Sequence, residues 1–311
     1  MNPLVLFLLG PTGSAKSDLS IHLAKLLSGE IISCDSMLVY KGMNIGTAKP
    51  AVREREGIKH HLIDIKSPSQ QFAVSDYRKL ALKAIEQVLR RGNLPIVVGG
   101  SGLYAQALID GLVPESKNTS KVRRSLEKKL EKYGLKYLYK RLQAIDPERA
   151  REILPSDPRR TVRALEIYET YKIKPSIWLQ KRVGLNELGY EWLMIGLRRD
   201  RAELYERINQ RVERMIEKGF VREVKSLSKK RLSRTARHAI GYQEMLSYLK
   251  GELPLDEAIQ ETKKRSRHLA KKQLTWFRKE SRIHWIDVKK ETSLNQLTEK
   301  VVNILNGKAS F

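Results

Sequence analysis

The stretch PLVLFLLGPTGSAKS, residues 3–17, joins a continuous apolar run to a glycine-rich loop and decides the fold class. The run from Pro3 to Leu9 is typical of a buried strand in a parallel sheet. Apolar residues at helical spacing follow between Lys16 and Leu27. A loop of the form G-x-x-x-x-G-K-S/T between such a strand and such a helix is a phosphate-binding P-loop, because its backbone N–H groups point at anionic oxygens.

The P-loop predicts a diphosphate-binding site. Lys16 would neutralise charge on the terminal phosphates, and the Ser17 hydroxyl could hold Mg²⁺. Ala15 stands where the pattern has glycine, so its methyl group must find room or its backbone must keep a negative φ. The loop indicates a diphosphate or triphosphate ligand, and does not by itself indicate hydrolysis or phosphoryl transfer. The residues predicted to bind the diphosphate are Gly10, Pro11, Thr12, Gly13, Ser14, Ala15, Lys16 and Ser17.

The first third of the chain continues the same alternation of elements. The runs Glu30 to Asp35 and Leu94 to Val98 predict strands, and Ser75 to Arg91 predicts a helix between them. Alternating strands and helices indicate an α/β protein with a parallel sheet. Asp35 would end its strand at the same edge of the sheet as the P-loop, where it could assist a metal or act as a base. The loop from Ser33 to Pro50 is either functional or a structural connection.

The pattern changes from about Ser120. Charged amphipathic helices are predicted over residues 121–133, 135–144 and 157–171, and strand signals return only at Glu191 to Leu197. Further helices are predicted over 201–218, 255–279 and 294–305, with a last strand over 282–288. The sequence therefore predicts a P-loop NTPase-like parallel sheet flanked by helices, with an all-helical insertion domain. The predicted domains are residues 1–115 and 191–311 for the α/β core and 116–190 for the insertion.

The charge balance points to a polyanionic partner. The 311 residues include 60 Lys and Arg against 35 Asp and Glu, a formal net charge of +25. Residues 1–120 carry 14 basic and 10 acidic side chains, residues 121–185 carry 18 and 8, and residues 186–311 carry 28 and 17. The surplus lies mostly after the first third, and such uneven placement favours a nucleic-acid partner over a generally solvated surface.

Composition also excludes several classes of protein. A single cysteine, Cys34, excludes a disulfide framework and any zinc module built on cysteines. No apolar run of about 18 residues occurs, so we expect no membrane span. The N-terminal apolar stretch has no basic region ahead of it and does not predict a signal peptide. A soluble cytoplasmic protein is expected.

Eight motifs in order resemble one family. They are GPTGSAKS (10–17), ISCDSMLVYKGMNIGTAKP (32–50), HHLIDI (60–65), VVGGSGLYAQAL (97–108), DPRRTVRALEIY (157–168), RINQRVERMIEKGF (207–220), HAIGYQEM (238–245) and KRSRHLAKKQLTWFRK (264–279). Over about residues 4–287 the chain resembles the bacterial tRNA dimethylallyltransferases, also called tRNA isopentenyltransferases.

The resemblance implies a prenyl transfer to RNA. Members of the family transfer a dimethylallyl group from dimethylallyl diphosphate to the exocyclic N6 amine of the adenosine at tRNA position 37, beside the anticodon, and release diphosphate. It implies that the P-loop holds the diphosphate of the prenyl donor, that Mg²⁺ is the cofactor, and that the tRNA anticodon stem-loop is the macromolecular partner. By analogy with the family we expect a monomer.

The resemblance also implies roles for individual residues. Asp35 matches the general base, Lys16 lies in the donor-binding loop, and Arg211 matches an arginine that grips the diphosphate. Ser101 stands where the family usually has threonine, at the bridging oxygen of the diphosphate, and it retains a hydroxyl. The positions that match tRNA-contacting stretches are Asp35, Ser36, Met37, Leu38, Ser101, Arg123, Arg159, Arg160, Thr161, Val162, Arg163, His238, Ala239, Ile240, Gly241, Tyr242 and Gln243.

Two other functions fit a P-loop. The chain could be a small-molecule or nucleoside kinase that uses ATP. The Leu94 to Val98 strand, however, ends in Gly-Gly-Ser and not in the Asp that helps such enzymes hold Mg²⁺. The chain could also be a non-catalytic RNA-binding module with a nucleotide switch. Asp35 beside a phosphate site favours chemistry, and loss of transfer in Asp35→Asn with RNA binding intact would distinguish the two.

Overall fold

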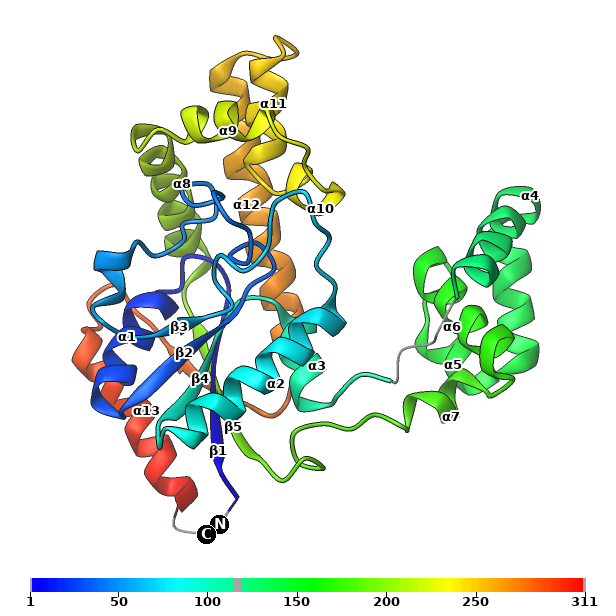
Figure 1. Ribbon diagram of the computed structural model, residues 1–311, viewed down its shortest axis with the longest axis horizontal. Helices are drawn as coiled ribbons and strands as arrows, with labels where there is room; N and C mark the ends of the chain where they lie inside the picture. Colours follow the sequence, from blue (N-terminus) through cyan, green and yellow to red (C-terminus); the bar gives the residue numbers. More distant parts are fainter. Residues whose placement is uncertain (1, 114–118, 310–311) are drawn as a thin grey trace. The chain divides into compact units, whose positions relative to one another are not determined.

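The computed structural model describes residues 2–113 and 119–309. Its centre is a six-stranded sheet in the order β3-β2-β4-β1-β5-β6, and every neighbouring pair of strands is parallel (Figure 1). The strands are β1 (Leu4–Leu9), β2 (Gly29–Cys34), β3 (His60–His61), β4 (Leu94–Gly99), β5 (Glu191–Arg198) and β6 (Ile283–Asp287). The predicted α/β class with a parallel sheet is confirmed.

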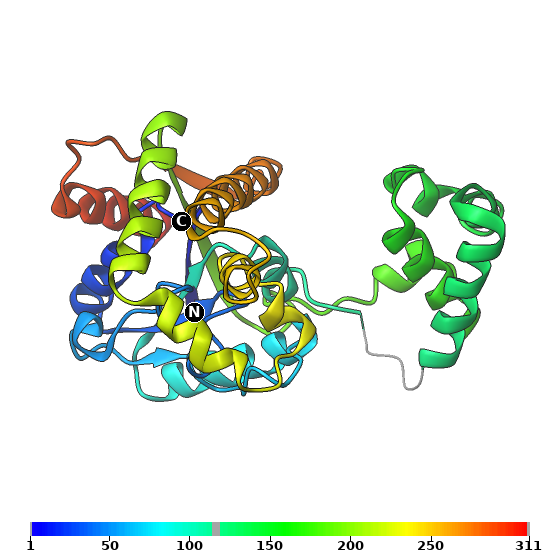
Figure 2. The same cartoon turned by 90° about the horizontal axis from the view of Figure 1, so that it is seen from above.

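One face of the sheet is covered by α1 (Lys16–Leu26) and α13 (Leu294–Ala309), which lie side by side in both views (Figure 1 and Figure 2). Side chains alternate along a strand, so Leu6 and Leu8 of β1 point to this face. They are fully buried in a cluster that includes Leu19 of α1 and Val301 of α13. The apolar faces of both helices therefore cover the strand that precedes the P-loop.

The opposite face is covered by α2 (Val74–Arg90) and α3 (Gly102–Ile109). Val5 and Phe7 of β1 point to this side and are buried in a cluster with Tyr77 and Ile85 of α2. The continuous apolar run of β1 follows from this arrangement, because a strand covered on both faces buries every side chain.

Helices near the carboxyl ends of the strands complete this unit (Figure 1). They are α8 (Arg201–Glu217), α9 (Phe220–Ser228), α10 (Arg234–Arg237), α11 (Tyr242–Leu249) and α12 (Leu255–Phe277), with a short 3₁₀ helix η1 (Val52–Arg55) on the segment after β2. Leu204 and Ile208 of α8 pack against Ala270 of α12. Among the helices of residues 2–113 and 119–309, none combines the length and the apolar composition that a membrane span needs.

Residues Asp110–Gly184 form a second compact unit. It consists of α4 (Ser120–Ile145), α5 (Pro147–Glu152), α6 (Pro158–Tyr171) and α7 (Pro175–Leu179) around Leu126, Leu138, Leu142 and Leu165. The unit begins and ends a few residues earlier than the predicted insertion at 116–190. The predicted boundary between 115 and 116 lies outside the described residues, and the domain limits stay predictions.

Local signals explain the helix boundaries in this unit. The backbone of Gly134 inside α4 is non-helical, with φ 75° and ψ 170°, so the two predicted helices 121–133 and 135–144 meet at this break. The Asp146 side chain accepts a hydrogen bond from Arg149 N at 3.0 Å and caps α5. Asp157 caps α6 in the same way through Arg160 N. A proline follows each cap, where its missing N–H costs nothing.

Candidate active site

The register of the sheet brings three strand ends together. Cys34 at the end of β2 pairs with Gly99 at the end of β4, and Gly99 also pairs with Leu9 at the end of β1. The P-loop, Asp35 and the Gly99–Ser101 turn therefore leave the sheet next to one another. Ser101 N donates to the carbonyl of Cys34 at 3.2 Å and joins two of these ends directly.

Glycine is required at two positions of the P-loop. Gly10 has φ 152°, and a Cβ there would lie 2.8 Å from the Leu197 carbonyl oxygen. Gly13 has φ 84°, and a Cβ would meet Leu204 and Ile208 of α8 at 3.3 and 3.4 Å. The loop thus lies directly against β5 and α8, and a side chain at either glycine would push it away from them.

Ala15 adopts a left-handed backbone, with φ 72° and ψ 20°. Of the two alternatives that the sequence left open, a negative φ at this position is therefore wrong. The half-buried methyl group instead finds room beside a cavity that the residue lines. The left-handed conformation costs an L-residue about 1–2 kcal/mol, which the surrounding loop contacts must offset.

Lys16 begins α1 and folds over its own loop. Its Nζ donates to the Pro11 carbonyl at 2.6 Å and lies 3.3 Å from Ser14 Oγ. Burial lowers the pKa of Lys16 to about 7, and the charge of Arg211 adds to this effect, whereas Asp35 and Cys34 oppose it. An anionic ligand beside this ammonium would favour its protonated form and raise its pKa.

Arginines of α8 reach the loop from the other side. Arg211 Nη1 donates to Thr12 Oγ1 at 2.7 Å, and its Nη2 donates to the Thr47 carbonyl at 3.1 Å. Arg207 Nε donates to the Gly13 carbonyl at 3.1 Å. Burial lowers the pKa of Arg211, and the negative charge of Asp35 opposes part of this shift. The sequence indicated Arg211 through the family resemblance and missed Arg207.

Asp35 directly follows β2, and its side chain contacts the backbone of the residues just after it. Its Oδ1 accepts hydrogen bonds from the backbone N–H of Met37 at 2.7 Å and of Leu38 at 3.3 Å. Within the described residues Oδ2 accepts none, so this oxygen can take a proton or a ligand. Asp35, Ser36, Met37 and Leu38 are all half-buried, and Asp35 and Leu38 line the same cavity as the P-loop.

Gln273 of α12 is a site residue that the sequence analysis missed. Its Oε1 accepts from Thr12 N at 3.0 Å, and its Nε2 donates to the Gly100 carbonyl at 3.0 Å. One amide thus bridges the P-loop and the turn after β4. Gln273 falls within the 264–279 motif that carries the family resemblance, but no local signal indicates its partner, because Thr12 lies 261 positions away.

These groups surround one cavity of about 260 Å³. Of the predicted diphosphate-binding residues, Thr12 to Ser17 line it, and Gly10 and Pro11 do not. Ser101 does not line it either, although the preceding Gly99 and Gly100 do. The remaining polar groups on its wall are Ser20, Ser33, Asp18, Asp35, Thr47, His60, Arg207, Arg211, Arg214 and Gln273.

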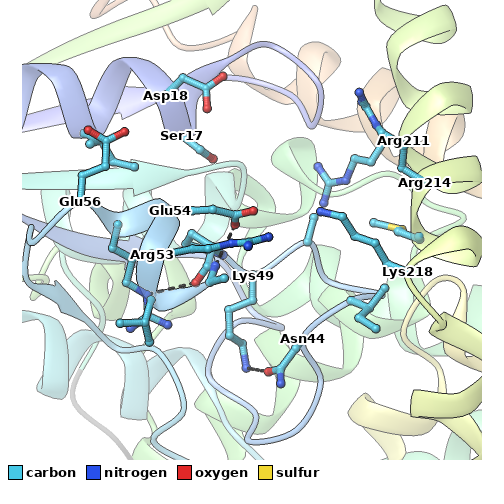
Figure 3. Close-up of a pocket in the computed structure, with 18 of the residues that line it drawn as sticks. Ser17, Asp18, Asn44, Lys49, Arg53, Glu54, Glu56, Arg211, Arg214 and Lys218 are labelled. Atoms are coloured by element: carbon cyan, nitrogen blue, oxygen red, sulfur yellow. Dashed lines mark hydrogen bonds between the residues drawn. The ribbon is translucent and has the colours of Figure 1, made fainter.

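A larger pocket of about 1,220 Å³ adjoins this cavity and shares Ser17, Arg211 and Arg214 with it. In Figure 3, Arg211, Arg214 and Lys218 enter from α8, and Arg53 enters from the opposite wall. The same pocket is also lined by the carboxylates Asp18, Glu54, Glu56 and Asp64, so its wall carries charges of both signs.

The predicted tRNA-contacting residues differ in exposure. Arg123 on α4 and Arg159, Arg160 and Arg163 on α6 are exposed within the helical unit. Thr161 and Val162 are 0% and 3% exposed, and their side chains pack inside that unit. Arg163 Nη1 lies 3.0 Å from the buried Glu166 carboxylate, which also lies 3.9 Å from Arg123 Nη1. Of the predicted contact residues in this helical unit, which lie within the described part of the chain, the four arginines present side chains that an RNA could reach and Thr161 and Val162 do not.

The predicted tRNA-contacting residues of segment 238–243 also differ in exposure. His238 is exposed and Ile240 and Gln243 are half-buried, whereas Ala239, Gly241 and Tyr242 are buried. Tyr242 is 1% exposed and begins α11. Its side chain faces the protein and does not reach solvent.

Comparisons with known proteins agree with this geometry. The sequence profile of the family described as IPP transferase matches residues 38–280. A tRNA dimethylallyltransferase from Thermoanaerobacter sp. (strain X514) is 43% identical over 99% of this chain and 99% of its own. One from Carboxydothermus hydrogenoformans is 45% identical over 97% of each chain. Neither of these two relatives is named as a kinase.

Solved structures give the same result. The full-length tRNA isopentenylpyrophosphate transferase of Bacillus halodurans is 40% identical and has a TM-score of 0.74 over 99% of this chain and 97% of its own. A eukaryotic dimethylallyltransferase acting on tRNA is 30% identical, with a TM-score of 0.83 over 99% of this chain and 80% of its own. The chain belongs to the IPP transferase family, which includes the bacterial tRNA dimethylallyltransferases.

Proposed function

We propose that this enzyme transfers a dimethylallyl group from dimethylallyl diphosphate to the exocyclic N6 amine of the adenosine at tRNA position 37 and releases diphosphate. One observation carries the proposal. A P-loop lysine, a half-buried arginine and a strand-end carboxylate all line a single cavity. The first two are suited to a diphosphate leaving group and the third to a proton. Family membership supports the same reaction.

In this reaction the diphosphate is bound by Lys16, Arg211 and the loop amides. When the allylic carbon leaves, negative charge develops on the bridging oxygen, and donors already aimed at that position lower the barrier. Arg211 contacts Thr12 of the loop at 2.7 Å, so its charge lies beside the amides that bind phosphate. Ser101 lies outside the cavity wall in this structure, and its contact with the bridging oxygen stays a prediction from the resemblance.

Asp35 acts on the adenine amine as the proton acceptor. An exocyclic adenine amine is a poor nucleophile because its lone pair is delocalised into the ring, so removing a proton as the new bond forms assists the reaction by about 10²–10⁴-fold. Oδ1 is held by two backbone amides. That fixed geometry leaves Oδ2 to accept the proton.

Mg²⁺ fits the oxygen donors of this site. Magnesium in phosphate-transferring sites uses one or two protein ligands and completes its coordination with phosphate oxygens and water. The Ser17 hydroxyl lines the cavity and would hold the ion, with the donor's own oxygens as further ligands. When bound, the ion would neutralise charge on the diphosphate. Within the described residues no group of three or more His, Cys, Asp or Glu could hold a metal by itself.

Exposed basic residues would bind the tRNA. The target base must leave its stack to reach the cavity, and bases of a single-stranded anticodon loop do so at lower cost than paired bases. The exposed Arg123, Arg159, Arg160 and Arg163 would contact the phosphate backbone of the anticodon stem-loop. We expect the enzyme to act as a monomer.

The test is mass spectrometry of unmodified tRNA after incubation with the enzyme, Mg²⁺ and dimethylallyl diphosphate, with ATP in a parallel reaction. We expect one dimethylallyl group on an anticodon-loop adenosine. Asp35→Asn should lose transfer and keep tRNA binding. The matched control is Asp256→Asn, which changes an exposed carboxylate at the start of α12 and should keep transfer. Phosphate transfer from ATP without prenylation would contradict the proposal and favour the kinase.

A further inference from the structure

Glu223 on α9 holds a segment of backbone far from it in sequence. Its Oε2 accepts from the N–H of Asn44 at 2.9 Å and of Ile45 at 2.8 Å, and its Oε1 accepts from the N–H of Gly46 at 3.2 Å. Three successive N–H groups that converge on one carboxylate form an anion-binding concavity. A protein carboxylate fills it here, which fixes the position of the segment.

Tyr242 completes this contact. Its hydroxyl donates to Glu223 Oε1 at 2.6 Å, and burial together with the Glu223 charge raises the pKa of Tyr242, so the hydroxyl keeps its proton. The Tyr242 ring meets the Phe220 ring edge-on at 5.1 Å. A Cβ at Gly46 would lie 2.1 Å from Phe220 Cε2 and 2.7 Å from Tyr242 Cε2, so the backbone at Gly46 rests directly on both rings.

The other end of the same segment is held by Lys49. Its Nζ donates to Asp64 Oδ1 at 2.6 Å, to Asn44 Oδ1 at 3.0 Å and to the Tyr40 carbonyl at 2.6 Å. Asn44 and Lys49 both appear in Figure 3 on the wall of the larger pocket. The residues between these two anchors, including Thr47, therefore have little freedom to move.

Thr47 is where this segment meets the diphosphate site. Its carbonyl accepts from Arg211 Nη2 at 3.1 Å, while Arg211 Nη1 donates to Thr12 of the P-loop at 2.7 Å. An arginine side chain has several rotatable bonds, so pointing it at one place requires a partner that is itself fixed. The Thr47 carbonyl is such a partner because Glu223 and Tyr242 hold the backbone just before it.

We infer that Glu223 and Tyr242 are positioning residues for prenyl transfer: they fix the Asn44–Gly46 backbone so that the Thr47 carbonyl aims Arg211 at the diphosphate. Neither lines the cavity or the larger pocket, so both act through other residues. The inference rests on the proposed function, in which Arg211 grips the diphosphate. It also gives the buried Tyr242 a role other than the RNA contact predicted from the sequence.

Glu223→Gln tests the inference most directly. The amide oxygen can still accept hydrogen bonds, but its NH₂ group turns toward at least one backbone N–H that the carboxylate had bound. We expect the dissociation constant for dimethylallyl diphosphate with Mg²⁺ to rise about tenfold, as one or two lost hydrogen bonds allow. Tyr242→Phe removes one hydroxyl, and we expect a rise of about threefold. In both variants KM for the donor should rise and kcat should fall, because Arg211 also stabilises the leaving diphosphate.

A double-mutant cycle with Arg211→Ala separates positioning from a general loss of structure. If Glu223 acts through Arg211, Glu223→Gln should weaken donor binding less than about twofold once Arg211 is already alanine. Glu213→Gln on α8 is the matched control, because Glu213 pairs with Lys263 at 2.7 Å and does not contact the 44–47 backbone. It should bind the donor as the unmodified enzyme does.

The outcomes are distinct. If Glu223→Gln weakens donor binding equally whether position 211 is arginine or alanine, the inference is overturned and the proposed function stays in place. An Arg211→Ala protein that binds donor as tightly as the unmodified enzyme would overturn both the role of Arg211 and the inference. If Glu223→Gln does not fold, Tyr242→Phe carries the same cycle, since it keeps the ring that packs on Phe220.

Discussion

At the scale of single residues, Lys16 links donor binding to pH. Its ammonium donates to the Pro11 carbonyl and lies near the Ser14 hydroxyl, and burial together with the charge of Arg211 lowers its pKa to about 7. A bound diphosphate would surround the same ammonium with negative charge and favour its protonated form. The pKa of Lys16 should therefore rise when the donor binds, and binding should take up a proton wherever the free lysine is neutral.

The sign of the pH dependence follows from this rise. The contribution of Lys16 to donor affinity is fully present below pH 7 and is lost as pH increases above it, by up to about tenfold per pH unit. At pH 8 calorimetry in two buffers with different ionisation enthalpies should detect uptake of close to one proton per donor bound. Lys16→Met should bind weakly and take up none. Equal proton uptake by both proteins would contradict the assignment.

Ala15 shows what the loop tolerates. Its φ of 72° lies where glycine is usual, yet the P-loop keeps its contacts with Gln273, Arg207 and Arg211. Three side chains from α8 and α12 thus hold a loop whose backbone conformation alanine disfavours. The sequence pattern indicated the position as unusual, and only the backbone angles show that the strain is accepted.

At the scale of elements, Gly134 divides α4. Its φ of 75° and ψ of 170° fall in a region that is nearly restricted to glycine, and no atom lies within 4 Å of the position that a Cβ would take. Gly134→Ala should therefore destabilise the helical unit by about 1–3 kcal/mol through the backbone alone. Hydrogen exchange of residues 120–145 should become faster than in the unmodified protein.

Gly307 on α13 gives the matched control. It also has open space around it, but its φ is not in the left-handed region. Gly307→Ala should leave exchange in 120–145 unchanged and stabilise α13 by up to about 1 kcal/mol, because alanine favours a helix interior. Unchanged exchange in Gly134→Ala would show that the break in α4 does not depend on glycine.

At the scale of the whole molecule, the exposed basic residues that contact RNA phosphates, drawn from a net charge of +25, should set the salt dependence of tRNA affinity. Neutralised RNA phosphates release counterions, so the logarithm of the binding constant should fall linearly with the logarithm of salt concentration. Arg159→Gln removes an exposed charge of α6 and should reduce the magnitude of the slope of this salt dependence by about one. Fluorescence anisotropy with a labelled anticodon stem-loop at several salt concentrations measures it.

The control for this prediction is Arg90→Gln at the end of α2. Arg90 is exposed and pairs with Glu86 one turn earlier at 2.5 Å, and it lies outside the helical unit. Its removal changes the net charge by the same amount and should leave the slope unchanged. The same reduction in both variants would indicate that overall charge, and not contact by α6, determines the salt dependence.

The sequence by itself determined the elements whose signals are local. β1, the P-loop and α1 follow one another without interruption, and each shows its own pattern of apolar residues or glycines. A fully buried strand shows a continuous apolar run, and a long amphipathic helix shows apolar residues at helical spacing over several turns, so β4, β5, α2, α8 and α12 were predicted as well. The short helices α3, α9, α10 and α11 were not, because few turns give a weak periodic signal.

The tertiary structure alone decided how the site is assembled. Gln273 meets Thr12 across 261 positions, and Glu223 meets Asn44 across 179. Nothing in the sequence around either partner marks such a contact, because a hydrogen bond between distant segments depends on how helices pack and not on neighbouring residues. The burial of Thr161, Val162 and Tyr242 has the same origin. The chain's local patterns therefore place the phosphate loop, and helix packing determines which side chains reach it.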